Sequence, residues 1–266
     1  MWQRRRIATY GLCRDEAGRV LLAGDGDLPG GPIRHGEHPR EAAIRTFTAA
    51  TGLTPQLDAL SDVRASFTIE GDEVVHTDRI TFAVRATPRA GLTWGDVLPE
   101  NEQAIEAQPR RDPTATRMQR FAAYGLTTDP AGRFLLTRIA DGYPGAGTWH
   151  LPGGGTDFGE QPTAGLLREL VEETGQEGRI LGLLGVTHYH NPRALGPEKR
   201  PMDWHTVRVL YRVVIDRPGT PSVVEEAGGS TAEARWVNSA ELGELPLNGF
   251  PRAAIAHHLG ERSLLW

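Results

Sequence analysis

The amino-acid sequence predicts an α/β fold in two successive, similar halves. The prediction rests on an internal repeat, on strand-like segments, and on an amphipathic segment with helix start and stop signals. The repeat is the clearest observation: RIATYGLCRDEAGRVLL from Arg6 matches RFAAYGLTTDPAGRFLL from Arg120 at eleven of seventeen positions. The chain is therefore interpreted as a duplication.

The first half, residues 1–115, contains two clear strand patterns. RIATYGLC is one, and HTDRITFAVR from His76 is the other, which lines up with HTVRVLYRVV from His205 in the second half. Cys13, the only cysteine, ends the first strand and is expected to be a buried core residue. NEQAIEAQPRRDPTATRMQ from Asn101 is expected to be a tail and linker.

The second half, residues 116–266, has the more complete pattern. Compared with the first half it inserts nine residues, GYPGAGTWH among them, before LPGGGTDFGE, and WVNSAELGEL predicts a strand followed by a short capped helix. Its strands are predicted near Phe121–Thr128, Phe134–Arg138, Arg179–His190, Trp204–Ile215 and Ala234–Val237, and its helices at Pro162–Thr174 and Pro251–Leu259.

The composition suits a chain with ordinary hydrophobic cores, since 39% of the 266 residues are hydrophobic and 24% are charged. A net charge of −5 and a pI near 6.0 argue against a general or duplex nucleic-acid binder. MWQRRR leads into a strand, so we expect neither a signal peptide nor a membrane span, and a cytoplasmic location. Lys199 is the only lysine among 29 basic residues, a bias that favours a GC-rich bacterial source.

Three glutamates crowd the predicted helix Pro162–Thr174. Glu169, Glu172 and Glu173 lie at i, i+3 and i+4 and share a face beside a leucine-rich face suited to burial. Like charges at this spacing cost roughly 0.2–0.5 kcal/mol per pair, and Arg168 alone cannot balance three carboxylates. A divalent cation can, and oxygen ligands without a thiolate favour Mg²⁺ or Mn²⁺ over zinc. Taken alone, the three residues also fit a solvated acidic helix face.

The spacing of further residues around this helix favours a metal site over a solvated acidic face. Residues at fixed spacing lie before, within and after the helix: Gly154, Glu160, Arg168, Glu169, Glu172, Glu173 and Gly175. Their spacing resembles the signature of the Nudix hydrolases, G-x5-E-x7-R-E-U-x-E-E-x-G-U, where U is aliphatic. The last position is Gln176 instead of an aliphatic residue, which bears on packing because this residue follows the helix.

The resemblance implies an α/β/α sandwich with a mixed sheet, and hydrolysis of a nucleoside diphosphate linked to another group. It implies that the three glutamates of the helix are ligands of Mg²⁺ or Mn²⁺, with one of them doubling as a general base, and that the backbone carbonyl of Gly154 also ligates. Arg168 would orient the glutamates by ion pairing. Glu160 would lie on the metal side or orient the helix. The implied partner is a small nucleotide.

The first half keeps part of the same signature, because Gly31, Glu37, Arg45 and Gly52 fall in register with it. The positions of the three metal-binding glutamates are instead occupied by Thr46, Ala49 and Ala50. We therefore expect a non-catalytic Nudix-like domain in residues 1–115 and the catalytic copy in residues 116–266. The two copies are expected to form an intramolecular pseudo-dimer, since many Nudix enzymes are homodimers.

Residues outside the signature are weaker candidates, each with a structural alternative. Glu225 or Glu226 is the nearest candidate for a general base on a separate loop, and His188, His190 and His205 fit a metal site or a structural role. Pro192 stands where ADP-ribose pyrophosphatases have a proline. Candidate substrate contacts are Trp149 and Trp204, for which core packing is more common, and the basic loop residues Arg193, Lys199 and Arg200.

Three interpretations of function stay open. The first is a metal-dependent pyrophosphohydrolase acting on a nucleoside triphosphate or a nucleotide sugar such as ADP-ribose, in preference to capped RNA or coenzyme A. The second is a nucleotide-binding sensor or scaffold built on the duplicated fold. The third, a non-hydrolytic enzyme such as an isomerase, has no supporting motif. The residues of the signature do not define the substrate.

Overall fold

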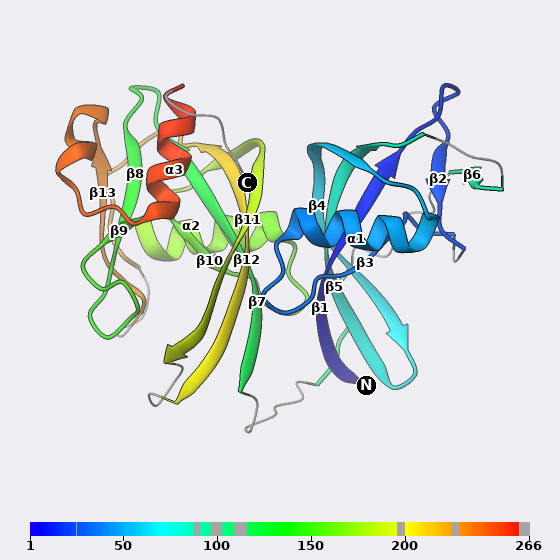
Figure 1. Cartoon of the computed structure of the whole chain (residues 1–266). Helices are drawn as coiled ribbons and strands as arrows, with labels where there is room; N and C mark the ends of the chain where they lie inside the picture. The colour runs from blue at the N-terminus through cyan, green and yellow to red at the C-terminus, as the bar shows by residue number, and fades with distance from the viewer. Residues whose placement is uncertain are drawn as a thin grey trace. The chain divides into compact units, whose positions relative to one another are not determined.

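A computed structural model of the protein describes residues 1–24, 26–87, 91–96, 103–108, 116–195, 200–224 and 229–260 (Figure 1). The chain folds into two compact units. Unit 1 comprises Met1–Phe121, Asp157–Gln161 and Val186–Arg208, and unit 2 comprises Ala122–Thr156, Pro162–Gly185 and Val209–Trp266. Unit 1 thus includes residues 116–121, Asp157–Gln161 and Val186–Arg208 of the second half, and the domain boundary near residue 115 stays a prediction.

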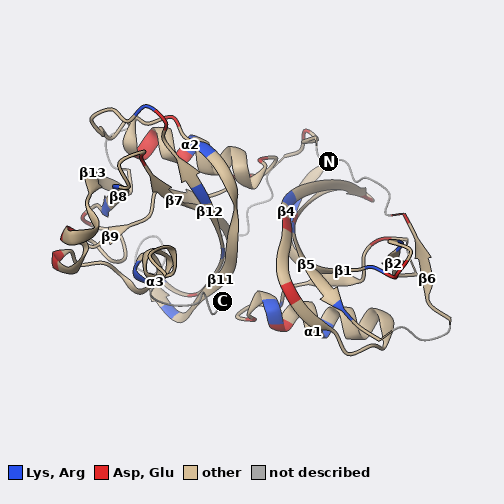
Figure 2. Ribbon diagram, turned by 90° about the horizontal axis from the view of Figure 1, so that it is seen from above, with Lys and Arg blue, Asp and Glu red and all other residues tan. Residues whose placement is uncertain are grey.

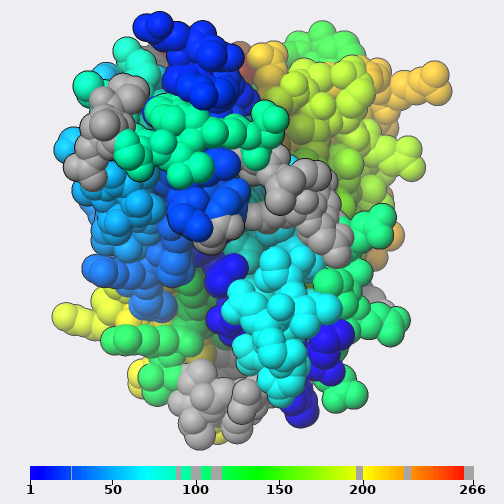
Figure 3. All heavy atoms as spheres, turned by 90° about the vertical axis from the view of Figure 1, so that its right-hand side faces the viewer, coloured from blue at the N-terminus to red at the C-terminus, as the bar shows by residue number. Residues whose placement is uncertain are grey.

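The first half is mainly β-structure with one helix. A mixed sheet has the order β3-β1-β5-β4, in which β1 and β5 are parallel and the other pairs are antiparallel, while β2 and β6 form a separate pair. The β4 to β5 turn is exposed (Figure 3, cyan atoms). The elements are β1 (Trp2–Cys13), β2 (Val20–Leu22), β3 (Gly30–Pro32), α1 (Pro39–Thr51), β4 (Gln56–Glu70), β5 (Glu73–Arg85) and β6 (Thr93–Gly95).

The second half contains the longer sheet, of order β11-β12-β7-β8-β13, with β10 paired to β7 and β9 to β8. The predicted strands and helices are all present. They are β7 (Arg117–Thr128), β8 (Phe134–Ile139), β9 (Trp149–His150), β10 (Gly153–Gly155), α2 (Pro162–Thr174), β11 (Arg179–Leu195), β12 (Pro201–Val214), β13 (Thr231–Val237), the 3-10 helix η2 (Ser239–Glu244) and α3 (Gly249–His258).

Unit 2 has helices on both faces of its sheet, so the α/β/α expectation is met there. A Cβ atom added to Gly125 of β7 would lie 3.4 Å from Leu166 of α2. The next residue, Leu126, belongs to a buried cluster with Phe250 and Ile255 of α3. Because successive strand residues point to opposite faces, α2 and α3 cover opposite faces, as Figure 2 shows.

The two halves share part of their strand order and the register of one strand pair. The order β3-β1-β5-β4 corresponds to β10-β7-β12-β11. Tyr10 of β1 pairs with Gly30 of β3, and its counterpart Tyr124 of β7 pairs with Gly153 of β10. The duplication remains a proposal, which this repeated register supports.

The described residues of the first half contain only one α-helix, α1, so they do not show the second helical layer expected there. Cys13 is buried, as expected, with 2% of its surface exposed. Burial raises the pKa of the Cys13 thiol, which keeps it protonated.

No helix among the described residues is long and apolar enough to cross a membrane.

Candidate active site

Helix α2 presents the acidic residues because its ends and its buried face are fixed. It begins at Pro162 and ends before Gly175, whose φ of 65° is the left-handed conformation that glycine adopts most readily. Leu166 and Leu170 are fully buried. Burial of this stripe turns Glu169 and Glu172 away from the core.

Arg168 links two of the three glutamates. Its Nη1 lies 3.2 Å from Glu169 Oε1 and 3.0 Å from Glu172 Oε2, and its Nη2 donates to the carbonyl oxygen of Gly155 at 3.3 Å. The Glu169 side chain is 14% exposed and that of Glu172 is 42% exposed. The two carboxylates therefore share one cation, and the orienting role of Arg168 stays a prediction that these contacts support.

Glu173 is held differently, because it is only 5% exposed. Its Oε2 accepts a hydrogen bond from the backbone N–H of Gly153 at 2.9 Å, and its Oε1 accepts one from Thr231 Oγ1 at 2.7 Å. These bonds connect α2 to β10 and β13. The family resemblance implies that all three glutamates are metal ligands, whereas the structure places Glu173 in a buried hydrogen-bond network. A ligand role for Glu173 stays a prediction.

Gly154 packs directly against one carboxylate. A Cβ atom at this position would lie 2.8 Å from Glu169 Cδ and 2.9 Å from both of its carboxylate oxygens. Only glycine lets the backbone of β10 approach this carboxylate so closely. Mg²⁺ is usually held by one or two carboxylates together with waters and substrate phosphates. Glu169 and Glu172 are therefore a donor set that fits Mg²⁺ or Mn²⁺.

Gly154→Ala is expected to weaken Mn²⁺ binding about tenfold or more, because the new methyl group displaces the Glu169 carboxylate. The side chain is flexible, so the midpoint of thermal unfolding should change little. Mn²⁺ titration of the purified variant measures the effect. Gly182→Ala is the control, since a Cβ there meets nothing within 4 Å. Wild-type Mn²⁺ affinity in Gly154→Ala would contradict this account of the site.

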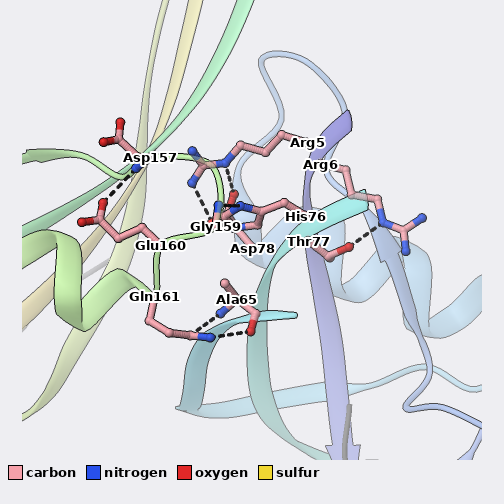
Figure 4. Close-up of polar contacts among 10 residues, drawn as sticks. All are labelled: Arg5, Arg6, Ala65, His76, Thr77, Asp78, Asp157, Gly159, Glu160 and Gln161. Carbon is pink, nitrogen blue, oxygen red and sulfur yellow. Dashed lines mark hydrogen bonds and ion pairs between the residues drawn. The ribbon is translucent and has the colours of Figure 1, made fainter. Parts of the chain in front are cut away.

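Glu160 lies in the loop Asp157–Gln161, which belongs to unit 1. Its Oε2 accepts a hydrogen bond from the backbone N–H of Asp157 at 2.9 Å, which closes the turn (Figure 4). Gly159 donates its N–H to His76 Nδ1 at 3.1 Å. The loop of the signature is thus held by a residue of the first half of the chain.

A series of polar contacts with residues of β5 and β1 holds that loop in place (Figure 4). His76 accepts from Gly159 through Nδ1, and its other ring nitrogen, Nε2, lies 3.2 Å from Asp78 Oδ1. Arg5 in turn donates to both oxygens of Asp78, at 2.8 and 2.9 Å. His76 and Asp78 are completely buried. The series Arg5, Asp78 and His76 therefore fixes the position of Gly159 beside Glu160.

The first half keeps part of the polar framework of the signature but lacks the three helix glutamates. The carboxylate of Glu37 accepts from the Arg34 N–H at 2.8 Å, as Glu160 does from Asp157, and pairs with Arg45 at 2.7 Å. Burial alone would raise the pKa of Glu37, but the Arg45 guanidinium and the Arg34 N–H outweigh it and hold the pKa below its usual value. Thr46 faces Gly31, its Cγ2 being 3.3 Å from an added Cβ. A threonine thus stands where Glu169 stands beside Gly154.

The remaining sequence candidates are dispersed. Trp149 is 5% exposed and belongs to the core cluster of unit 2, which favours core packing over base stacking. Trp204 is half-buried in unit 1 and donates from its indole to Thr206 Oγ1 at 2.6 Å. Arg193 is exposed, and it lies on β11 rather than in the expected loop. Lys199, Glu225 and Glu226 lie outside the described residues.

Gln176, the departure from the signature, has a packing role, as the sequence suggested. It is 6% exposed. Its Oε1 accepts from the Gly219 N–H at 2.8 Å, and its Nε2 is 3.4 Å from the Thr220 carbonyl oxygen. A polar side chain is tolerated at this buried position because the neighbouring backbone satisfies its amide.

Unit 2 thus combines an α/β/α arrangement with carboxylates on a helix next to a glycine strand, and such carboxylates are ligands that divalent cations accept. The model of the NUDIX domain family matches residues 118–258, just over half of the chain. The chain therefore belongs to the Nudix family.

Individual relatives are more distant. The chain is 36% identical over 80 residues to a MutT-like protein of Streptomyces ambofaciens, covering 30% of this chain and 49% of that protein, so it spans about half the length of this curated relative. The MutT protein of Methanosarcina mazei Go1 is 20% identical, with a TM-score of 0.42, covering 56% of this chain and 100% of that one. The Nudix domain of Shewanella oneidensis NrtR, solved with ADP ribose, is 21% identical, with a TM-score of 0.40. The match covers 57% of this chain and 93% of that one.

Proposed function

We propose that this protein is a divalent-metal-dependent Nudix hydrolase that cleaves a phosphoanhydride bond in a nucleoside diphosphate derivative. The observation that carries the proposal is the arrangement of Glu169 and Glu172 around Arg168, with the Glu169 carboxylate against the backbone of Gly154. This places two oxygen ligands at the edge of a glycine strand. The buried Glu173 keeps that strand and the helix together.

Each residue has a proposed part in the reaction. Glu169 and Glu172 would hold Mg²⁺ or Mn²⁺, and the carbonyl of Gly154 would add a ligand. When bound, the metal neutralises charge on the phosphates and lowers the pKa of the attacking water. Arg168 keeps the two carboxylates in place, and Glu160 fixes the turn before the helix. Glu225 or Glu226 remains the proposed source of a general base.

The proposed substrate is a nucleoside triphosphate or a nucleotide sugar such as ADP-ribose.

We also propose that residues 1–115 are a degenerate Nudix copy, which supports the catalytic copy through the contact of His76 with the loop Asp157–Gln161. The repeated register and the retained Glu37 and Arg45 pair support this assignment. A cytoplasmic location is part of the same proposal.

A screen of nucleoside triphosphates, nucleotide sugars, dinucleotides, coenzyme A and capped RNA, each with Mg²⁺ and Mn²⁺, tests the proposed function. Released phosphate, pyrophosphate and nucleoside monophosphate are measured. We expect metal-stimulated release from a triphosphate or a nucleotide sugar. Tight nucleotide binding without turnover would instead favour the sensor or scaffold. Activity restricted to capped RNA or coenzyme A would overturn the proposed substrate class.

A further inference from the structure

Five of the nine histidines gather in unit 1. They come from the turn before α1, from β11 and from β12, and five pairs of their rings have centroids 5.0 to 5.8 Å apart. None of them belongs to the Nudix signature. The five are His35, His38, His188, His190 and His205.

Three of these histidines are engaged in other contacts. His38 caps α1 by accepting the Arg40 N–H at Nδ1, at 3.2 Å. His205 Nδ1 lies 3.0 Å from Gln119 Nε2, and its Nε2 lies 3.2 Å from His188 Nδ1. Burial, reinforced by His188, lowers the pKa of His205 to about 4. His205 is therefore neutral near pH 7 and packs as a structural side chain.

The other two histidines converge on one carboxylate. His190 Nε2 lies 2.7 Å from Asp203 Oδ1, and His35 Nε2 lies 3.0 Å from the same oxygen. One ligand atom from each of the three residues lies within 4.8 Å of the others, and among the described residues this is the only such group of three. The His35 Nε2 atom is buried and makes no hydrogen bond of normal geometry within the described part of the chain.

The backbone holds these three side chains in place. Gly36 has a φ of 79°, and a Cβ added there would lie 2.8 Å from His190 Cε1, so the turn carrying His35 fits closely against the His190 ring. Asp203 is fixed through its backbone N–H, which donates to the Thr116 carbonyl oxygen at 2.8 Å. Side-chain exposures of 19%, 31% and 23% leave the group reachable from solvent.

We propose that His35, His190 and Asp203 form a transition-metal site, separate from the acidic residues of the Nudix signature, that binds Zn²⁺. Two imidazoles and one carboxylate are ligands that zinc accepts readily, whereas Mg²⁺ prefers oxygen alone. Zinc ligand distances of about 2.0–2.2 Å require ligand atoms roughly 3–3.5 Å apart in a tetrahedron. The observed spacing needs only a small adjustment, with water in the fourth position.

Bound zinc would connect three segments of unit 1 that are remote in sequence: the turn before α1, β11 and β12. The site therefore stabilises the unit, and it does not depend on the proposed hydrolase activity. Without metal the same three side chains can still form hydrogen bonds, so a hydrogen-bonded trio is the alternative. Zinc affinity distinguishes a metal site from a group of three hydrogen-bonded side chains, because a group without metal-binding geometry would not bind zinc.

The test is a calorimetric titration of the metal-free full chain with Zn²⁺ at pH 7.5, in excess Mg²⁺ to fill the acidic site. We expect one zinc per chain with a micromolar or tighter Kd, and a rise of several degrees in the midpoint of thermal unfolding. Asp203→Asn keeps the shape and a carbonyl oxygen but removes the charge, and it should weaken zinc binding at least tenfold. His190→Gln should do the same.

Two matched controls make the result specific. His257→Ala removes a histidine of α3 outside the cluster, and Glu172→Gln alters the acidic site. Both should keep wild-type zinc affinity. The proposal is overturned by a wild-type chain that does not bind zinc, or by equal affinities in wild type and Asp203→Asn. It is equally overturned if zinc binding disappears in Glu172→Gln and persists in Asp203→Asn.

Discussion

Glu172→Gln is expected to lower kcat by at least a hundredfold on the substrate that the screen identifies, which corresponds to about 2.7 kcal/mol of barrier. Glu172 is the most exposed of the three helix glutamates, and its carboxylate contacts Arg168 at the surface. Glutamine keeps the size and polarity of the side chain but removes the charge that would hold the metal. Steady-state kinetics at saturating Mn²⁺ measure the change.

The control is Glu177→Gln, which removes an exposed acid just beyond the helix and should keep wild-type kcat. Thermal unfolding of Glu172→Gln should match wild type closely. Glu173→Gln is a poorer test, because an amide cannot accept both hydrogen bonds that the Glu173 carboxylate receives, so the fold weakens together with the site. Wild-type kcat in Glu172→Gln would remove this residue from the metal site.

Asp78→Ala is expected to lower the free energy of unfolding by about 3 kcal/mol or more, because it leaves Arg5 and His76 without their buried partner. Urea denaturation measures the loss. Loss of the carboxylate also frees the His76 ring that holds Gly159, so turnover by the folded variant should fall as well. Unchanged stability would show that the buried carboxylate contributes no net free energy.

Asp58→Ala is the matched control, since Asp58 forms a similar bidentate pair with Arg85 at an exposed position. It should leave the unfolding free energy nearly unchanged.

The pH dependence of stability gives a second check on Asp78. Burial alone raises the pKa of Asp78, but Arg5 and His76 outweigh it and hold the pKa below its usual value. Asp78 therefore stabilises the fold above the unfolded pKa of about 3.9, and this stability is lost as pH falls through the lower folded pKa.

The sequence predicted the local features of the second half well. Helix α2 has the predicted bounds, because Pro162 and Gly175 provide physical start and stop signals. The short helix after β13 is also present, with a capping box between Asn238 and Glu241. These features depend on neighbouring residues, which is why sequence patterns reveal them.

The expected basic loop of residues 191–203 was partly wrong. β11 continues to Leu195 and β12 begins at Pro201, so Arg193 lies on a strand. This stretch contains three prolines and many polar residues, which disfavour a strand by local preference. The pairing of β11 with β12 in the sheet overrides that preference.

Contacts between remote residues were beyond prediction from one sequence. His76 and Gly159 are 83 positions apart, and nothing local indicates that one accepts a hydrogen bond from the other. His190 was among the sequence candidates, but His35 and Asp203 were not, because only the folded chain brings the three residues together. The burial of Glu173 was missed for the same reason, since Thr231 is 58 positions away.

Gln161 has a consequence for how the protein behaves at high concentration. Strand β4 ends the order β3-β1-β5-β4 and is therefore an edge strand. The Gln161 amide accepts from the Ala65 N–H at 2.8 Å and donates to the Ala65 carbonyl oxygen at 2.9 Å, as a neighbouring strand would (Figure 4). Open sheet edges recruit strands from other molecules and so promote aggregation. A single side chain here occupies two of the backbone groups with which an incoming strand would pair, near the middle of β4.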